Sequence, residues 1–372
     1  MTSRWINLLR KPLTAIIISV LTGFIIGAVV LTASGYDALE AYRIMFSGIA
    51  GSPKYMAQVV VNAVPIILTG LSVAFAFRTG LFNIGAEGQF VMGALTGTMI
   101  GYYLPLPPII HPIVIFALAF LVGGLYGALA GYLKNKFGIH EVISTIMLNW
   151  IAFYFNNYIV NLPGVKVEST LHANPILDSA KINFFSTAWR RSDAGREFIR
   201  EHEILGEIVK TDLGAGIFVA IIFAFLLWFV LRHTTTGFEL RAVGLNRFAA
   251  EFSGVPVKKS IFLSMFIAGG VAAVGGAILV LSTTNTVSVL SAQEGYGWDG
   301  ISVSLIANGN PLAVLFSGLL FAALRYGGML IQSKTGAPTE IINIMIGSIV
   351  LAVAVAPALP RLADYLSQRR AR

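Results

Sequence analysis

Long runs without a charged residue recur along the whole chain. A helix needs about 20 residues to cross the roughly 30 Å hydrocarbon core of a bilayer, and most of these runs reach or exceed that length. The run at 88–133 is long enough for two crossings, and the four prolines within 105–112 interrupt it near its middle, as prolines do at a tight turn. The runs cover residues 12–36, 55–77, 88–133, 142–165, 213–231, 260–293, 301–324 and 341–360.

The amino-acid composition also indicates a protein that is embedded in a lipid bilayer. Only 12% of the residues are charged, against about 25% in an ordinary soluble domain, which excludes one large soluble core. The sequence predicts an all-α polytopic membrane protein, with residues 1–372 forming a single transmembrane domain. About ten segments are expected, the eighth too short for a full span, at 13–33, 57–77, 87–103, 112–133, 141–160, 214–231, 260–281, 297–309, 311–331 and 340–357.

The distribution of Lys and Arg predicts the orientation, because cytoplasmic loops carry an excess of them. Both termini are expected in the cytoplasm, so the net charge of +8 reflects membrane topology and calls for no nucleic-acid partner. The short outer loops hold only Arg43, Lys54, Arg325 and Lys334. The cytoplasmic set is Arg4, Arg10, Lys11, Arg78, Lys134, Lys136, Arg232, Arg241, Arg247, Lys258, Lys259, Arg361, Arg369, Arg370 and Arg372.

Two further segments complete the topology. The first apolar stretch ends without a convincing cleavage site and is predicted to be a retained helix, not a signal peptide. Residues 161–213 form a long extracytoplasmic loop, which orientation rules do not govern because long loops translocate regardless of charge. This loop is interpreted either as a solvated cap over helix ends or as a landing surface for an external protein.

No pattern in the chain indicates catalysis. There is no cysteine, the five histidines lack metal-ligand spacing, and no Gly-x-Ser-x-Gly elbow is present. A Gly-x-x-x-x-Gly-Lys-[Ser/Thr] nucleotide loop is also missing. The chain is therefore predicted to be no enzyme and to hold no metal or cofactor, and any ATP-driven step would reside on another polypeptide.

A glycine-rich stretch, Phe77–Gly93, places an acid and two amides at the edge of a predicted span. A broken helix at membrane depth is tolerated only where it packs in protein or lines a water-filled cavity. Glu87 is costly in hydrocarbon and needs a partner or water. It is expected either to pair with Arg78 or cap a helix end, or to line a transport pathway together with Asn83 and Gln89.

A second glycine-rich stretch, Gly295–Pro311, has the same character, with one acid, Asp299, before a short apolar segment and Asn308 in the turn that ends it. Asp299 is interpreted either as a cap of its own helix or as a pathway residue. Five spans in each half predict an inverted repeat, helices 1–5 against helices 6–10, in which the two broken stretches correspond.

The fifth predicted helix is rich in rings and amides. Asn149, Phe153 and Asn156 share one helical face. Packing or an aromatic belt at the membrane surface is one interpretation. The other is a pathway wall, because stacking surfaces and amide groups suit a flat polar solute.

Between two apolar runs lies the polar, helix-capable loop 236–255, within the expected cytoplasmic loop 234–259. It is interpreted as a docking element, with an ordinary solvated connector as the alternative. Its characteristic residues are Gly237, Glu239, Arg241, Gly244, Asn246, Arg247, Glu251 and Gly254.

This loop resembles the cytoplasmic coupling loop of ATP-binding cassette (ABC) importer permeases, in the branch that carries ribose-type sugars, branched-chain amino acids and nucleosides. The strings Gly80-Leu-Phe-Asn-Ile-Gly-Ala-Glu-Gly-Gln-Phe90 and Gly138-Ile-His-Glu-Val-Ile-Ser-Thr-Ile-Met-Leu-Asn-Trp150 are similar to signatures of the nucleoside permeases within that branch. The long 161–213 loop departs from the compact sugar permeases.

The resemblance implies a permease subunit that carries a small neutral solute, nucleosides first, with ribose or galactose and branched-chain amino acids as alternatives. An ion-coupled secondary transporter is the competing class, and it would need carboxylates at mid-span, where this chain has none. The implied partners are an ABC ATPase subunit that binds the ATP, a second permease that is a paralogue or else an identical copy, and an extracytoplasmic substrate-binding lipoprotein. The implied location is the plasma (cytoplasmic) membrane, with the lipid bilayer around the helices.

Overall fold

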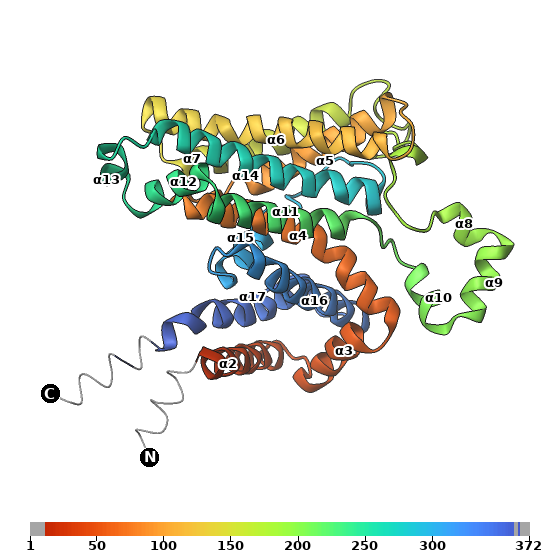
Figure 1. Ribbon diagram of the computed structural model, residues 1–372. Coiled ribbons are helices and arrows are strands. Elements are labelled where there is room, and N and C mark those ends of the chain that lie inside the picture. The colour runs from red at the N-terminus through yellow and green to blue at the C-terminus, as the bar shows by residue number, and fades with distance from the viewer. Residues whose placement is uncertain (1–11, 361–363, 365–372) are drawn as a thin grey trace, which may run out of the picture. The chain divides into compact units, whose positions relative to one another are not determined.

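The computed structural model describes residues 12–360 and 364, and in these residues the regular structure is helical, with only isolated β-bridges. Figure 1 shows the chain. The long helices are α2 (Pro12–Ala33), α4 (Pro53–Arg78), α5 (Ala86–Tyr103), α6 (Ile110–Phe137), α7 (Glu141–Val160), α11 (Gly216–His233), α14 (Val257–Leu279), α16 (Pro311–Thr335) and α17 (Thr339–Val355). The shorter ones are α3 (Ala38–Ala50), α8 (Thr187–Arg191), α9 (Asp193–Glu201), α10 (Glu203–Val209), α12 (Thr235–Leu245), α13 (Arg247–Phe252) and α15 (Tyr296–Ile306).

Each of the ten predicted segments corresponds to one helix, and α7 has the predicted bounds. The proline-rich break is confirmed, because α5 ends at Tyr103 and α6 begins at Ile110. Five helices are long and apolar enough to cross a membrane, α4, α6, α11, α16 and α14 with its continuation to Thr284, and shorter apolar helices cover Ile17–Ala33 and Thr339–Val355. The all-α, polytopic prediction is therefore confirmed. Seven basic residues used for the orientation lie outside the described residues: Arg4, Arg10, Lys11, Arg361, Arg369, Arg370 and Arg372.

Helix α3 was not among the predicted segments. Asp37 caps it by accepting the backbone N–H groups of Leu39 and Glu40 at 2.8 and 3.1 Å. One face is buried, at Ala41 and Met45, while Leu39 is exposed. The Tyr42 hydroxyl donates to the carbonyl of Phe24 on α2 at 2.6 Å, and burial raises the pKa of Tyr42 to about 12.

The chain divides into two compact units, one built from the residues up to Tyr55 and from Ala323 onward, the other from Met56–Ala322. In the first unit, α2 packs along α17, and the lack of a side chain at Gly23 permits close approach, since a Cβ there would lie 2.7 Å from the Cα of Ile349.

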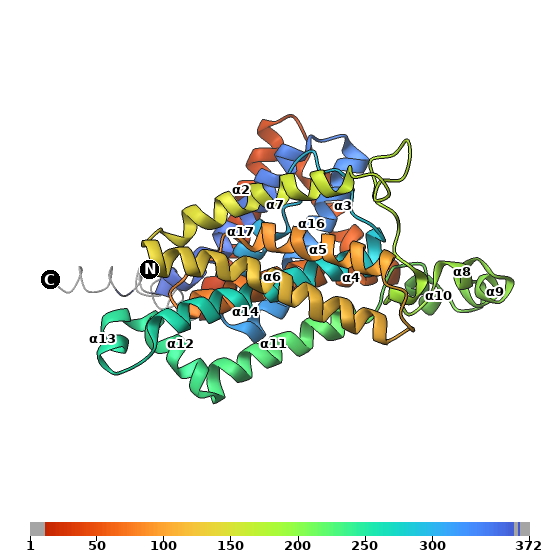
Figure 2. The same cartoon turned by 90° about the horizontal axis from the view of Figure 1, so that it is seen from above.

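The second unit is centred on α4 and α14. They are the most buried of the five long apolar helices, with 89% and 78% of their apolar windows inside the protein. Helix α14 lies against α5 and α6 (Figures 1 and 2). Glycines make this packing possible, because a Cβ at Gly123 of α6 would lie 2.6 Å from the carbonyl oxygen of Gly269 on α14.

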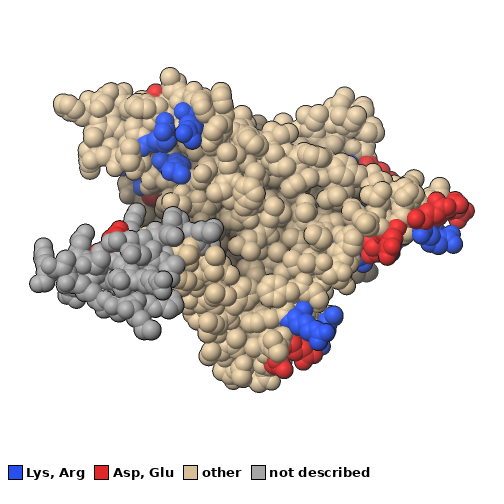
Figure 3. Space-filling view, turned by 60° about the horizontal axis from the view of Figure 1, so that its bottom comes forward, with Lys and Arg blue, Asp and Glu red and all other residues tan. Residues whose placement is uncertain are grey.

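Two groups of short helices lie at opposite ends of this second unit. In both Figure 1 and Figure 2, α12 and α13 are at the left, and α8, α9 and α10 project at the right. We refer to residues 187–209, which hold α8–α10, as the arm. Figure 3 shows one face of the molecule, on which uncharged atoms cover most of the surface and charged atoms gather in a few clusters, as helices that face lipid require.

Candidate functional site

The first glycine-rich stretch breaks the chain between α4 and α5. Gly80 has a φ of +71°, a left-handed conformation that favours glycine. The side-chain amides of Asn83 and Gln89 bond to each other in both directions, at 2.8 and 3.1 Å, and Asn83 also donates to the Ser72 hydroxyl of α4 at 3.1 Å. All three side chains are buried. The predicted pair Asn83 and Gln89 therefore ties the break to α4 from inside the protein.

Glu87 joins this break to the second one. Its two carboxylate oxygens accept the backbone N–H groups of Gly295 and Gly297 at 2.7 and 2.6 Å, at the start of α15. The contact needs a glycine at 297, because a Cβ there would lie 2.2 Å from the backbone nitrogen of Glu87. One turn further along α5, Phe90 stacks on Tyr296 with ring centroids 4.8 Å apart. Glu87 thus caps a helix distant in sequence, where the positive end of the helix dipole favours its charge.

The alternative that Glu87 pairs with Arg78 is wrong. The Arg78 guanidinium instead donates to the backbone carbonyls of Gly309 and Asn308 at 2.7 and 3.2 Å, so it holds the turn between α15 and α16. Asn308 itself is exposed and adopts a φ of +50°. Asp299 lies half-buried in the first turn of α15, a position that agrees with a favourable interaction with that helix's dipole.

The predicted face of α7 is confirmed. Asn149, Phe153 and Asn156 are all buried, whereas Trp150 and Tyr154 between them are exposed. Asn149 bridges to the first break, accepting the N–H of Gly88 at 2.8 Å and donating to the carbonyl of Ile84 at 3.0 Å. Asn156 donates to the carbonyl of Ser288 at 2.9 Å, and Phe153 packs edge-on against Trp150. One helix face therefore holds both the α5 break and the segment before α15.

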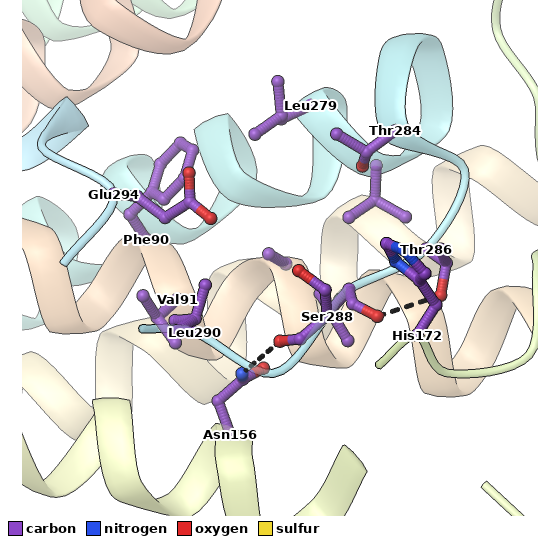
Figure 4. A pocket seen from close by; sticks show the side chains of 13 residues that line it. Phe90, Val91, Asn156, His172, Leu279, Thr284, Thr286, Ser288, Leu290 and Glu294 are labelled. Atoms are coloured by element: carbon purple, nitrogen blue, oxygen red, sulfur yellow. Dashed lines mark hydrogen bonds between the residues drawn. The ribbon is translucent and has the colours of Figure 1, made fainter. Parts of the chain in front are cut away.

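A cavity of about 300 Å³ lies between these elements (Figure 4). Its walls come from α5, α7, the end of α14 with the π-helical turn Val280–Thr284, and the extended segment that follows. Of the predicted pathway residues, Asn156 is in this lining. The full lining is Phe90, Val91, Ala94, Asn156, His172, Leu279, Val280, Thr284, Thr286, Val287, Ser288, Leu290 and Glu294.

Most of these lining residues were missed by sequence reasoning. Phe90 ends the first glycine-rich motif and was not singled out. The segment 282–286 is a run of hydroxyl and amide residues at the end of an apolar stretch, and this polarity was the available signal. Nothing in the local pattern around His172 indicates that it reaches the cavity, because its position depends on long-range pairing.

That pairing forms one wall of the cavity. The N–H of Ala173 donates to the carbonyl of Val287 at 2.9 Å, and the N–H of Val289 donates to the carbonyl of Leu171 at 2.8 Å. Ile176 donates in the same way to Asn285, which ends the π-helical turn with a φ of +59°. The first part of the long 161–213 loop thus lies on the helix bundle as a cap, whereas the arm projects from it (Figure 1). The landing-surface interpretation of the arm stays a prediction.

The predicted docking loop forms two helices, α12 and α13. Asn246 caps α13 by accepting the N–H groups of Phe248 and Ala249 at 3.0 Å each. The glycines pack against the chain itself, because a Cβ at Gly244 would lie 2.3 Å from the carbonyl oxygen of Arg78, and one at Gly237 would lie 2.0 Å from that of Val230. Gly254 has a φ of +84° after α13. Arg241, Arg247 and Glu251 are exposed and Glu239 is half-buried.

Large apolar side chains of this loop are also exposed, beside its charged ones. Leu245, Phe248 and Phe252 are 89%, 81% and 97% exposed. Phe248 and Phe252 are four residues apart, which is the sequence signal that they share one face of α13, and Leu245 ends α12 just before it. Large apolar side chains this exposed mark an interaction surface. We call these three residues the apolar stripe.

Comparisons with known proteins agree over most of the chain. The family described as "Branched-chain amino acid transport system / permease component" matches residues 55–354. The guanosine ABC transporter permease protein NupP of Bacillus subtilis is 36% identical, with 93% of both chains covered. The nucleoside ABC transporter permease protein NupB of Lactococcus lactis is 30% identical over 94% of this chain and 92% of its own length. The glucose ABC transporter permease protein TsgB13 of Haloferax volcanii is 29% identical over 90% and 85%. No solved structure matches.

Proposed function

Because the chain belongs to the family of permease components of branched-chain amino acid transport systems, we propose that it forms the membrane pathway for nucleosides in an ABC importer. As a permease component it is a transport subunit and not an enzyme, and ATP hydrolysis takes place on a separate subunit. One observation carries the choice of cargo: the guanosine permease NupP is similar to this chain over 93% of both lengths.

The cavity suits a small uncharged solute with a flat ring. Its volume, about 300 Å³, is at the lower end of the range of small-molecule pockets, about 300–1,000 Å³. Phe90 offers an aromatic wall, and Asn156 and Thr284 offer polar groups. None of the described residues that line it is Lys or Arg, the residues that an anionic nucleotide would require.

The predicted pathway residues divide into two roles in this proposal. Asn156 contacts the solute, together with Phe90. Asn83, Gln89, Asn149 and Glu87 are not in the cavity lining and bond to protein groups, so they position the two broken stretches around the pathway. Phe153 supports α7 from its buried side, while Asp299 and Asn308 lie at the two ends of α15.

For the topology, the proposal adopts the ten predicted spans and the inverted repeat of five spans against five. Helices α4 and α14 are the second spans of the two halves and are also the most buried. Helices α5 and α15 are the third spans, and each begins after a break, with the two starts in contact through Glu87. We expect both termini and the α12–α13 end of the second unit in the cytoplasm, the arm outside, and the chain in the plasma membrane.

The partners follow from the same assignment. The apolar stripe on α12–α13 is the surface for the ATPase subunit, which binds the ATP, and the docking residues named from the sequence lie in these two helices or next to them. An extracytoplasmic binding lipoprotein delivers the solute. The second permease is a paralogue, as supported by a second guanosine ABC transporter permease protein of Bacillus subtilis, NupQ, which is 26% identical over 70% of this chain.

Uptake of labelled solutes tests the cargo. Cells with and without the gene receive guanosine, uridine, ribose, glucose and leucine, each as label and as competitor. Loss of nucleoside uptake alone supports the proposal. Loss of sugar uptake instead would support the second candidate, a sugar permease, which the glucose permease of Haloferax volcanii favours. Leucine would point to the branched-chain amino acid alternative, and uptake that follows an ion gradient without ATP would support a secondary transporter.

A further inference from the structure

A second hollow of about 300 Å³ in the second unit has a lining separate from that of the cavity, and three helix ends meet the middle of α12 there. Arg78 is the last residue of α4, and Arg232 is in the last turn of α11. Arg241 comes from α12, and Pro311 begins α16. We call this hollow the arginine cleft; its lining is Arg78, Trp228, Leu231, Arg232, Arg241, Asn310 and Pro311.

The arginine cleft gathers positive charge without an internal counter-charge. No Asp or Glu is among the described residues that line it, and none of its three arginines forms an ion pair within residues 12–360. Arg78 donates to the carbonyls of Gly309 and Asn308, and Arg241 donates to the carbonyl of Gly237 at 3.3 Å. These carbonyls are neutral, so the three charges remain.

Ordinary helix chemistry accounts for only part of this arrangement. The negative end of a helix dipole favours a basic residue in the last turn, which explains Arg78 and Arg232 one at a time. It does not explain why Arg241 joins them, nor why the N-terminus of α16, a positive dipole end, lies at the same place. Four positive contributions in one hollow indicate that an anion belongs there.

The position of the arginine cleft indicates where the anion comes from. Helices α4 and α11 are both long and apolar enough to span a membrane, and the cleft lies at their ends. Trp228, which lines it, is of the residue type that concentrates at membrane surfaces. Along α11 the apolar side chains Phe225 and Phe229 are exposed, as a surface against acyl chains would be.

We propose that the arginine cleft binds the phosphate group of an anionic phospholipid headgroup, with the acyl chains along α11. Guanidinium groups suit this ligand because they donate paired hydrogen bonds to phosphate oxygens. Basic pockets between membrane helices on the cytoplasmic side are known to hold such headgroups. The lipid would join α4, α11 and α12 to the α15–α16 turn, and so connect the docking helices to the spans. This inference is independent of which solute is carried.

Binding is tested on the full chain, purified in its complex in neutral detergent. Dioctanoyl phosphatidylglycerol, dioctanoyl phosphatidylcholine and inorganic phosphate are titrated separately, and the thermal unfolding midpoint is followed. Ligands that bind only the folded state raise this midpoint by an amount that grows with the logarithm of ligand concentration above Kd. We expect phosphatidylglycerol to do so and the other two to leave it unchanged. An equal rise with phosphatidylcholine would overturn recognition of the charge, and an equal rise with inorganic phosphate would overturn a lipid as the source.

Two variants localise the effect. Arg232→Gln removes one positive charge from the cleft. Asn310→Asp adds a negative charge, and its carboxylate can still accept the N–H of Leu312, which Asn310 accepts at 3.1 Å. Both are expected to weaken the apparent affinity for phosphatidylglycerol by about five- to tenfold, since one charge near an anionic headgroup contributes about 1 kcal/mol. Lys259→Gln, an equal charge change at the start of α14 outside the cleft, is the control. Wild-type affinity in both variants would refute the site.

Discussion

The carboxylate of Glu87 accepts the backbone N–H of Gly297 at 2.6 Å, so the first turn of α5 holds the first turn of α15, 210 residues away in the chain. Both carboxylate oxygens are used, the other by Gly295. The two broken stretches that the sequence indicates separately are therefore joined in the structure, and both hydrogen bonds that join them end on one acidic side chain.

Glu87→Gln tests this connection. An amide presents only one oxygen, and its NH₂ group faces an N–H that it cannot bond. We expect the free energy of unfolding to fall by about 1–3 kcal/mol, the cost of leaving a buried donor without its charged acceptor, and uptake to fall with it. Thermal unfolding in detergent and solute uptake are the measurements. Glu168→Gln, in the exposed part of the long loop, is the matched control. A Glu87→Gln protein with a wild-type midpoint would contradict the capping role.

Asn149→Ala tests whether α7 acts by positioning or by contact with the solute. The substitution leaves the N–H of Gly88 and the carbonyl of Ile84 without their partner inside the protein. We expect a loss of about 1–3 kcal/mol in stability for each unsatisfied group, accompanied by lower uptake. Ile151→Ala, on the exposed face of the same helix, is expected to be neutral. Lower uptake at an unchanged unfolding midpoint would instead place Asn149 in the pathway as a solute contact.

Phe90→Leu tests the aromatic wall. Stacking of a base on an aromatic ring contributes about 1–3 kcal/mol, so the apparent KM for guanosine should rise by about tenfold. Ribose, which has no base to stack, would compete as weakly as before. Initial uptake rates over a range of concentrations give the KM. Phe225→Leu, on the exposed face of α11, is the control and keeps the wild-type KM. An unchanged KM in Phe90→Leu would remove this ring from the binding site.

Phe248→Asp and Phe252→Asp test the apolar stripe. Both side chains are exposed on α13, so charge there costs little in folding, but it opposes burial against another protein. We expect co-purification of the ATPase subunit to fall by at least tenfold while membrane insertion and the unfolding midpoint stay unchanged. Ile204→Asp, on the exposed surface of the arm, is expected to keep the ATPase. Normal co-purification of both α13 variants would refute the stripe as the contact.

Gly244 is a poor probe of the same surface. Any side chain there meets the backbone of Arg78 and Gly80, so a substitution disturbs the end of α4 before it disturbs a partner. The exposed phenylalanines separate docking from folding, and the glycine does not.

Most of the helices can be predicted from the sequence because their positions depend on local residue types. Apolar length places the spans, and the prolines in 105–112 place the turn between α5 and α6. Helix α3 escaped because Glu40 and Arg43 interrupt its apolar pattern, and it is stable only because one face packs in its own unit. With 13 residues, α3 is shorter than the roughly 20 apolar residues that a membrane span needs, so a search for spans does not detect it.

The candidate site is less visible in the sequence because distant segments build it. The residue types at Asn83, Glu87 and Gln89 mark the first break correctly, but their partners could not be assigned. The partner of Glu87 is a backbone group, and backbone groups carry no sequence signature. His172 and Ser288 reach the cavity through a bridge between two loops, and such pairing follows from how the helices bring their ends together.

The bridge between residues 171–176 and 285–289 has a consequence for how the cavity can exchange its contents. Three backbone hydrogen bonds, to the carbonyls of Asn285, Val287 and Leu171, join the loop between the fifth and sixth predicted spans to the segment between the seventh and eighth. The three bonds lie at successive positions of two antiparallel segments, so they hold the same pair of segments together. Solute can therefore pass through this side of the cavity only if these bonds break or if both segments move together.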